Sequence, residues 1–311
     1  MPSVANATLS GSLADSLDVV TSSARIVREF EGVMTQAVDR ITLRENIGIT
    51  WREVDLAKLT AQDITESTVL DNPQKIADTL FQVTPTVIGI HTVITDRVRM
   101  RVSSETLAQM GRLAQNAIER LKSQRGHSIL SSASTDLGNT SNPLLSAFIA
   151  AGVARIRGNS NEPGMPPFQV VLHPFGVHDI WSEIVTGVMP EHQTANRVVG
   201  ATPTDPNSIS ATRPGDAGSI FQNGFRGNVA GAAIMEDGLL STSSNNSTGG
   251  VFAKEGIVLV QGFAPRTYTE RMNNLGGGAE VLYIYDEFAY GERSSGNWVF
   301  GLSHDATAPT G

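Results

Sequence analysis

The chain has 311 residues, of which 40% are apolar and 17% are charged, a composition typical of an ordered globular protein and not of a disordered one. It contains no cysteine, which excludes disulfides, thiolate catalysis and cysteine-based metal sites. The net charge of −8 disfavours tight binding of nucleic-acid phosphates, although it permits a shell that encloses nucleic acid without gripping it.

The first part of the chain is predicted to be an arm followed by a helix. Residues 1–20 are rich in Ser, Ala and Asn, and they have neither the basic region nor the apolar run of a signal peptide. Apolar residues then recur at helical spacing from Ile26 to Ile41, which predicts a helix over about 22–40. Because no segment approaches 18 uncharged apolar residues, we expect no membrane span.

Two extended segments follow, at about 49–65 and 77–94, joined by a polar turn at 66–74. Each is about 17 residues long, whereas strands commonly have about 5–6. An isolated hairpin of this length cannot bury its own apolar side chains. Either a neighbouring subunit covers it or the two segments are central strands of one domain, and the sequence leaves both interpretations open.

A long helix is predicted from about Ser104 to Gln124, with Gly126 just past its end as a left-handed cap. Its apolar stripe consists of Leu107, Met110, Leu113, Ala114, Ala117, Ile118 and Leu121. At about 1.5 Å per residue this helix spans about 30 Å. Residues 127–142 are rich in Ser, Thr, Gly and Asn and are predicted to be a loop at a domain boundary.

The next region is predicted to be a compact α/β piece. A helix from Pro143 to Gly158 precedes a short strand over 168–172, and Pro174 opens another helix. Residues 187–250 are the least regular part, with a strand at 227–236 and a loop at 241–250.

A second long hairpin is predicted near the C-terminus. A bent strand over 257–272 leads through a glycine turn at 273–278 to a return strand over 280–289, and a last strand lies at 298–300. The interpretation places Val281, Tyr283, Tyr285 and Phe288 on one face of the return strand.

The sequence has no convincing reactive constellation. It contains no nucleophile elbow and no phosphate-binding glycine loop, and His173 and His178 do not have the spacing of a helical metal site. The adjacent Ser303, His304 and Asp305 are expected to form a loop, since a catalytic triad converges from separate segments. The paired acids at 286–287 and 236–237 are expected to be solvated or bound to arginine. We therefore predict no catalytic, cofactor or metal site, and no enzyme.

The order of these parts resembles the major capsid protein of tailed double-stranded-DNA bacteriophages, whose fold is shared with encapsulins. Short stretches of the amino-acid sequence are also similar to those of this family, from about Arg28 to Pro309. The segments that carry the resemblance are ITWREV at 49–54, KLTAQ at 58–62, ITDRV at 94–98, MGRLAQNA at 110–117, NGFRG at 223–227 and YDEFAYGER at 285–293. They resemble packing and interface motifs rather than catalytic signatures.

The resemblance implies an α+β capsid fold with five parts. These are an N-terminal arm (1–45), an extended β-hairpin loop (46–94), a peripheral domain with a spine helix (95–135), an axial α/β domain (136–255), and the long hairpin of the peripheral domain with the C-terminal segment (256–311). The resemblance further implies subunit-interface residues in the extended loop and at the hairpin tip, namely Trp51, Arg52, Glu53, Lys58, Asp71, Asn72, Gln74, Asn274, Gly276 and Gly277.

The implied function is structural, as a shell subunit that self-assembles into pentamers and hexamers around double-stranded DNA without sequence-specific binding. The implied location is the virion capsid, assembled in the cytoplasm of a host bacterium. Only about 45 residues precede the hairpin, so we expect a separate scaffolding protein, together with a portal protein and in some cases a decoration protein. The alternatives are an encapsulin-like compartment and a soluble enzyme with an unrecognised site.

Overall fold

The computed structural model describes residues 32–44, 48–61, 63, 74–101, 104–183, 227–275, 277–294 and 296–309. The chain divides into two compact units, each of which mixes helix and strand. The described residues of unit 1 lie within Arg40–Lys122 and Val258–Gly291, and those of unit 2 lie within Phe30–Asp39, Ser123–Ile257 and Glu292–Gly311. The range 256–311 is thus divided between the two units.

Unit 1 contains a five-stranded sheet built around one long strand, β12 (Ala279–Glu292). The sheet order is β1 (Asp39–Thr42), β10 (Ile257–Gln261), β12 and β11 (Arg266–Met272), and β4 (Thr86–Thr95) also pairs with β12. Both β11 and β4 run antiparallel to β12, so that Tyr283 lies opposite Tyr268 on one side and His91 on the other. The predicted second hairpin is confirmed by the pairing of β11 with β12.

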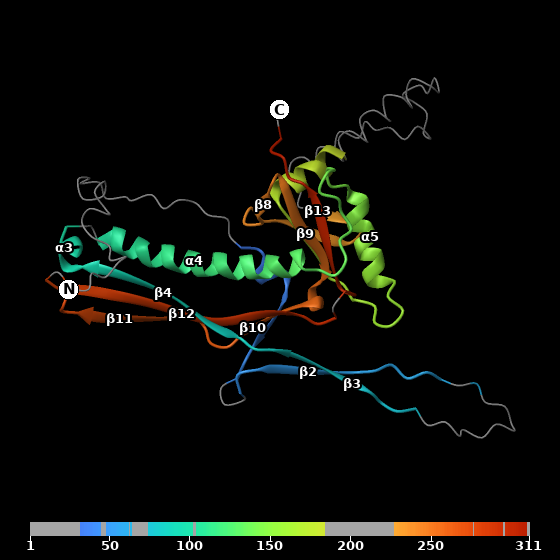
Figure 1. The fold of residues 1–311 in the computed structure, drawn as a ribbon, viewed down its shortest axis with the longest axis horizontal. Helices are drawn as coiled ribbons and strands as arrows, with labels where there is room; N and C mark the ends of the chain where they lie inside the picture. Colours follow the sequence, from blue (N-terminus) through green and yellow to red (C-terminus); the bar gives the residue numbers. More distant parts are fainter. Residues whose placement is uncertain are drawn as a thin grey trace, which may run out of the picture. The chain divides into compact units, whose positions relative to one another are not determined.

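The long helix α4 (Ser104–Ser131) packs along one face of this sheet (Figure 1). Ala114 and Ile118 are buried against Ile284, with Leu282 and Ile90 beside them. No helix among the described residues is both long and apolar enough to span a membrane.

The helix extends further than the sequence predicted, because Gly126 lies inside it and does not cap it. The helix continues to Ser131, so the predicted loop at 127–142 begins only after that residue. A β-carbon on Gly126 would lie 3.0 Å from the Cβ and Cε atoms of the buried Met34. The glycine therefore makes room for a neighbouring side chain within unit 2.

A separate ribbon in unit 1 consists of β2 (Trp51–Leu56) and β3 (Asp78–Val83). The predicted single strand over 77–94 is wrong, because the segment is interrupted at Thr84 and Pro85 and then continues as β4 in the five-stranded sheet. Proline has no amide hydrogen to donate to a strand ladder, which explains the break. The antiparallel ladder of the ribbon therefore covers only six residues of each strand.

The predicted helix over 22–40 lies mostly outside the described residues. Within them the chain forms one short helix, α2 (Met34–Ala37), and then the strand β1. The prediction was wrong for the end of this segment, because Asp39 and Arg40 already belong to β1. Ile41, the last residue of the predicted helical stripe, packs from this strand against Val258 and Val260 of β10.

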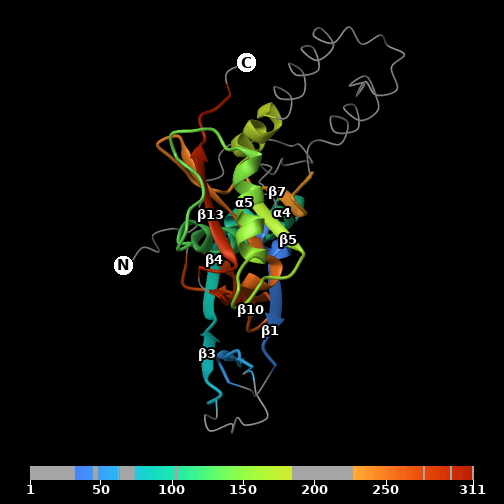
Figure 2. The same ribbon diagram turned by 90° about the vertical axis from the view of Figure 1, so that its right-hand side faces the viewer.

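Unit 2 is built on a six-stranded mixed sheet (Figure 2). Its order is β13 (Val299–Asp305), β9 (Asn246–Ala253), β5 (Phe168–Leu172), β7 (Ala232–Glu236) and β6 (Asn228–Val229), and β8 (Thr242–Ser243) also pairs with β9. β5 and β7 are parallel, which confirms a strand at 168–172 within an α/β unit. A short 3-10 turn, η2 (Lys254–Gly256), connects β9 to β10.

Two helical segments accompany this sheet. Ile149, Val153 and Ile156 of α5 (Ser146–Arg157) share the core of unit 2 with Val170 and Val251 of the sheet. Helical residues begin at 174, as Pro174 predicted, and are described to 183. The helix α5 begins at Ser146 and not at Pro143, where the sequence placed it. Two acids of the segment 174–183 bind backbone amides at this start. Asp179 accepts from Leu144 N at 3.2 Å, and Glu183 accepts from Ser146 N at 2.6 Å.

Two predicted loops of unit 2 are strands. Residues 241–250 form β8 and most of β9, joined by a turn at Ser244 and Asn245 with φ of 52° and 64°. The segment 303–305 belongs to β13, which pairs with β9 along its length. Small polar residues look like loop residues in sequence, but here they allow close packing in a central strand.

Candidate subunit-interface surface

The ribbon of β2 and β3 has two unlike faces. On one face, Trp51, Phe81 and Val83 pack with the β10 residues Val258 and Val260. The ring of Trp51 meets Phe81 edge to face, with the ring centroids 5.8 Å apart. This face anchors the base of the ribbon to the rest of unit 1.

The other face of the ribbon is open, and aliphatic side chains occupy half of its positions. Val54 and Leu80 lie directly opposite each other across the ladder, and 55% and 54% of their surfaces are exposed. Leu56, two residues further along β2 on the same face, is 72% exposed. Figure 1 shows the ribbon extending beyond the five-stranded sheet. A two-stranded ribbon is marginally stable alone, and a contiguous exposed apolar patch marks an interaction surface.

The predicted interface residues of the ribbon take different positions. Arg52 is exposed beside Val54 on the open face, whereas Glu53 is half-buried and Trp51 packs within the chain. Lys58 is exposed beyond the end of the ladder. Asp71 and Asn72 lie outside the described residues.

Gln74 joins the two segments of the loop past the end of the ladder. Its amide oxygen accepts from Thr60 N at 2.8 Å, and its amide nitrogen donates to Thr60 O. The side chain therefore imitates one more pair of strand hydrogen bonds. A glutamine that faces an extended segment can bind the backbone of that segment through its carboxamide, and this is the feature of the sequence that indicates the role of Gln74.

The tip of the β11–β12 hairpin is a second predicted contact point. Asn274 and Gly277 are exposed there, and Gly277 has φ of 91°, while Gly276 lies outside the described residues. The tip is joined to the short helix α3 (Asp96–Arg99), because Asp96 N donates to Gly278 O at 2.8 Å. The tip and the ribbon belong to different sheets of unit 1.

Two exposed ion pairs surround this tip. Arg271 contacts Asp96 at 2.7 Å, and Arg99 contacts Glu280 at 2.6 Å. Exposed pairs of this kind contribute about 0–1 kcal/mol each to stability, so their main effect is to fix the geometry of the tip.

Aromatic side chains gather on the face of the five-stranded sheet that α4 does not cover. Tyr268, Tyr283 and His91 form one row across three strands, and Tyr285 stacks on Tyr283 with centroids 6.0 Å apart. The ring of Tyr285 lies over Gly89, where a β-carbon would approach it to 2.7 Å. Tyr283, Tyr285 and His91 line a hollow of about 310 Å³.

The sequence predicted this aromatic face only in part. The predicted face lacked Tyr268 and His91, whose alternation with neighbouring residues was the available signal, and it wrongly contained Phe288. Phe288 is buried near Lys122 of α4, on the opposite face, because the strand alternates strictly and 288 has the parity of Ile284.

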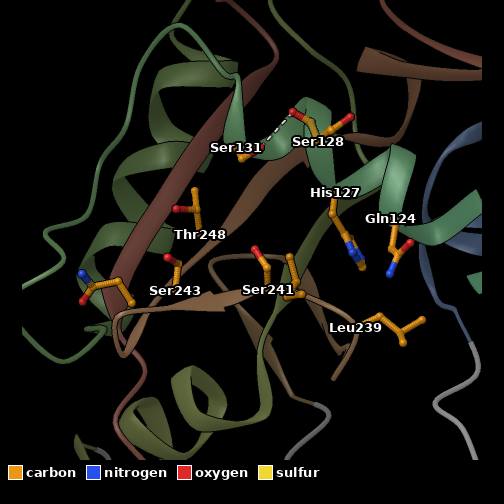
Figure 3. A pocket seen from close by; sticks show the side chains of 10 residues that line it. Gln124, His127, Ser128, Ser131, Leu239, Ser241, Ser243 and Thr248 are labelled. Atoms are coloured by element: carbon orange, nitrogen blue, oxygen red, sulfur yellow. Dashed lines mark hydrogen bonds between the residues drawn. The ribbon is translucent and has the colours of Figure 1, made fainter. Parts of the chain in front are cut away.

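A pocket of about 410 Å³ lies in unit 2, between the end of α4 and the β8–β9 segment (Figure 3). Its lining combines polar side chains with two leucines, and no acid, lysine or arginine is among the described residues that line it. The lining residues are Gln124, His127, Ser128, Ser131, Leu239, Leu240, Ser241, Ser243, Asn246 and Thr248. In Figure 3, His127 and Gln124 point from the helix toward the segment that carries Leu239.

The histidine of this pocket is part of a structural pair. His127 Nε2 lies 3.0 Å from Asp237 Oδ2, and both side chains are buried. Asp237 also accepts from Val33 N at 3.4 Å and from Leu239 N at 2.9 Å. Within the described part of the chain, His127 Nδ1 has no partner, so no serine completes a triad. The pair ties three segments of unit 2 together.

The other candidate reactive groups also have structural roles. His173 Nδ1 accepts from Phe175 N at 3.3 Å at the start of the helical segment, and His178 is exposed. Ser303 Oγ donates to Asp136, and the adjacent His304 is fully buried. Across the residues that the structure describes, no three His, Cys, Asp or Glu side chains are grouped as metal ligands.

The paired acids differ from their prediction. Asp286 and Asp237 were expected to be solvated or bound to arginine, but both are fully buried. Their partners are Lys122 at 2.6 Å and His127 at 3.0 Å. Asp237 directly follows strand β7 and Asp286 lies inside strand β12. Two adjacent acidic residues in a sequence do not indicate that either one is buried.

No protein-family model matches the chain, and no curated protein matches it in sequence. Solved structures do match it in fold. The head structure of Helicobacter pylori bacteriophage KHP40 is similar with a TM-score of 0.69 and 10% identity, covering 93% of this chain and 95% of that one. The chain has the fold of phage capsid proteins.

Two further structures show the same fold over nearly the whole chain. The capsid of cyanophage Pam1 has a TM-score of 0.66 and 12% identity, covering 94% of this chain and 97% of that one. The capsid of Ralstonia phage GP4 has a TM-score of 0.63 and 11% identity, covering 94% and 96%. The predicted α+β capsid fold is therefore confirmed, although the sequences have diverged widely.

Proposed function

We propose that this chain is the major capsid protein of a tailed double-stranded-DNA bacteriophage and assembles into the pentamers and hexamers of an icosahedral shell. The capsid fold supports this role, which is structural. The observation that carries the proposal is the open apolar face of the β2–β3 ribbon, with Val54, Leu56 and Leu80 exposed. In an isolated chain these aliphatic side chains would remain in contact with water, whereas a second subunit would bury them.

The ribbon docks on a neighbouring copy of the chain. Its anchored face holds the base in place, while its open face presents a line of aliphatic side chains to the next subunit. Burying an exposed valine or leucine contributes about 1.5–3 kcal/mol. Since every subunit of a shell makes this contact once, a modest gain per contact accumulates over the assembly.

The parts of the capsid subunit follow from this assignment. The ribbon within 46–94 is the extended loop, and 95–135 with the β11–β12 hairpin forms the peripheral domain. Residues 136–255 form the axial domain, to which we add 292–309 because β13 shares its sheet. The described residues proposed to contact other subunits are Arg52 on the ribbon, Lys58 past the end of its ladder, and Asn274 and Gly277 at the tip.

The partners follow from the same role. A separate scaffolding protein and a portal protein direct assembly in the cytoplasm of a bacterial host, and a decoration protein binds some shells of this fold. The shell encloses double-stranded DNA without reading its sequence. The net charge of −8 agrees with weak phosphate contact.

Electron microscopy of the purified chain, expressed with and without its neighbouring genes, tests the proposal. Closed shells, or rings of five or six subunits, are expected from the wild type. The double variant Val54→Asp with Leu80→Asp places two charges on the open face, and we expect it to remain folded but to lose shells. A clean monomer of the wild type under both conditions contradicts the proposal.

The matched control exchanges Asp55 and Thr79, which lie opposite each other on the other face of the ribbon. Asp55→Thr with Thr79→Asp keeps the composition and the cross-strand neighbours, so shells should still form. Shells that carry an enzyme and no DNA in the natural host identify an encapsulin-like compartment instead.

A further inference from the structure

Unit 1 buries one lysine and one aspartate against each other. Lys122 of α4 and Asp286 of β12 expose 7% and none of their side chains, and Lys122 Nζ lies 2.6 Å from Asp286 Oδ2. Oδ2 has no hydrogen-bond partner among the described residues, so this ion pair is the contact that holds it. The amine and the carboxyl group are therefore held in contact by the packing of a helix on a sheet.

A second carboxylate adjoins the amine. Glu119 lies one helical turn before Lys122, and its Oε1 is 3.0 Å from Lys122 Nζ. Unlike Asp286, Glu119 is partly exposed, with 43% of its side chain accessible. It is thus placed to exchange a proton between the buried amine and the surface.

The surroundings of the pair are aromatic and largely buried. The ring of Phe288 lies 5.7 Å from Lys122 Nζ, and Tyr290 meets Phe288 edge to face. The hydroxyl of Tyr290 is buried without a hydrogen-bond partner in the described part of the chain. Burial, followed by the charge of Glu119, raises the pKa of Tyr290.

We propose that Lys122 and Asp286 form an intramolecular amide bond after the chain folds, with Glu119 as the proton carrier. The inference does not depend on the assembly of the chain. It needs only the contact between α4 and β12 within unit 1.

The reaction is a condensation that needs no oxidant, reductant or cofactor. Glu119 first carries one proton from the ammonium group of Lys122 to the carboxylate of Asp286, which neutralises both groups. The amine then attacks Cγ of Asp286, and a carbon–nitrogen bond forms. Glu119 takes a proton from the nitrogen and delivers it to the departing carboxyl oxygen. The carbon–oxygen bond breaks and one water molecule leaves, so Glu119 ends in its starting state and both buried charges are removed.

Two physical effects favour the bond at this position. Holding the two groups in contact on rigid elements removes most of the entropy of bringing them together. Burying a charged pair carries a large desolvation penalty, which a neutral amide avoids. In water the same reaction runs toward hydrolysis, so the dry aromatic surroundings are essential to it.

The mass of the intact, denatured chain tests the proposal directly. We expect a mass lower than that of the sequence by one water molecule. After digestion with trypsin, we expect no cleavage following Lys122 and a branched peptide that joins residue 122 to residue 286. A full sequence mass, with cleavage after Lys122, overturns the proposal.

Two variants separate the chemistry from the packing. Lys122→Arg keeps a cation beside Asp286 but removes the nucleophilic amine, so it should fold and show its full sequence mass. Glu119→Gln changes a partly exposed side chain and should also leave the bond unformed. Because packing defects do not change a covalent mass, a branched peptide in E119Q would overturn the role of Glu119.

Discussion

His173 and His304 are buried histidines of unit 2 whose pKa values are lowered. The pKa of His173 is lowered from 6.5, mainly by burial and then by the charge of His304, while Asp237 opposes the shift. The pKa of His304 is lowered mainly by burial, against a hydrogen bond to Leu302 O and nearby carboxylates. At the start of the helical segment, Phe175 N donates a hydrogen bond to His173 Nδ1. This bond needs a lone pair on Nδ1, which protonation of that nitrogen removes.

These shifts predict a loss of stability in mild acid. An unfolded histidine takes up a proton near pH 6.5, before its folded counterpart does, so the free energy of unfolding falls as the pH drops below about 6.5. The loss continues until the lowered folded pKa values are reached. Urea unfolding of the unassembled chain between about pH 8 and pH 5 measures the slope.

His304→Gln should flatten this slope, because one of the two groups is removed. The raised pKa of Asp179, caused mainly by burial, acts in the opposite direction and stabilises the fold toward the acid end. The variant also loses the charge of His304 beside Asp179 and His173, which lowers the pKa of both groups, so its loss flattens the slope further. Identical slopes for the two proteins would contradict a contribution of His304 to the loss of stability in acid.

At the scale of elements, strand β9 depends on glycine at two adjacent positions. A β-carbon on Gly249 would lie 2.3 Å from the backbone oxygen of Val171 in β5, and one on Gly250 would lie 2.8 Å from Leu130 at the end of α4. Backbone cannot move aside as a flexible side chain can. These glycines therefore allow three elements of unit 2 to approach closely.

Gly249→Ala should destabilise unit 2 by about 1–3 kcal/mol, the usual cost of overpacking a close contact. The control is Gly111→Ala in α4, where a β-carbon would meet nothing within 4 Å. Alanine favours a helix over glycine, so G111A should stabilise the chain by about 1 kcal/mol. Urea midpoints of the two variants should move in opposite directions. Equal effects would count against the close approach at β9.

At the scale of the whole molecule, the division into two units implies that assembly and folding can be separated. The ribbon belongs to unit 1, whereas the core built on β5, β9 and α5 belongs to unit 2. A change confined to residues 66–74, past the end of the ribbon, is therefore expected to leave the core of unit 2 intact.

Deletion of residues 66–74 should abolish shells and leave unit 2 folded. The deletion shortens the extended loop and also removes Gln74, whose amide joins the two segments at Thr60. Electron microscopy reports the loss of shells, and circular dichroism with urea reports the remaining fold. Normal shells from this variant would falsify the role of the loop as a clamp between subunits.

Local patterns predicted much of the element order. The strand at 168–172, the α4 helix, the helical start at Pro174 and the β11–β12 hairpin each follow from apolar spacing, proline or a glycine turn, which act within a few residues. The Ser- and Gly-rich strand β9 and the break at Pro85 were missed. In those places, long-range pairing with β5, β13 and β12 decides the conformation.

The sequence by itself indicated the order of helices and strands and the absence of a reactive motif, because composition and periodicity are local properties, and its resemblance to capsid proteins implied the α+β shell fold. Only the tertiary structure decided that Val54 and Leu80 share an open face, that Asp286 meets Lys122, and that Asp237 meets His127. These pairs are separated by long stretches of chain, and their contact depends on strand register and helix packing. One-residue shifts in register would exchange the faces, so no local pattern specifies them.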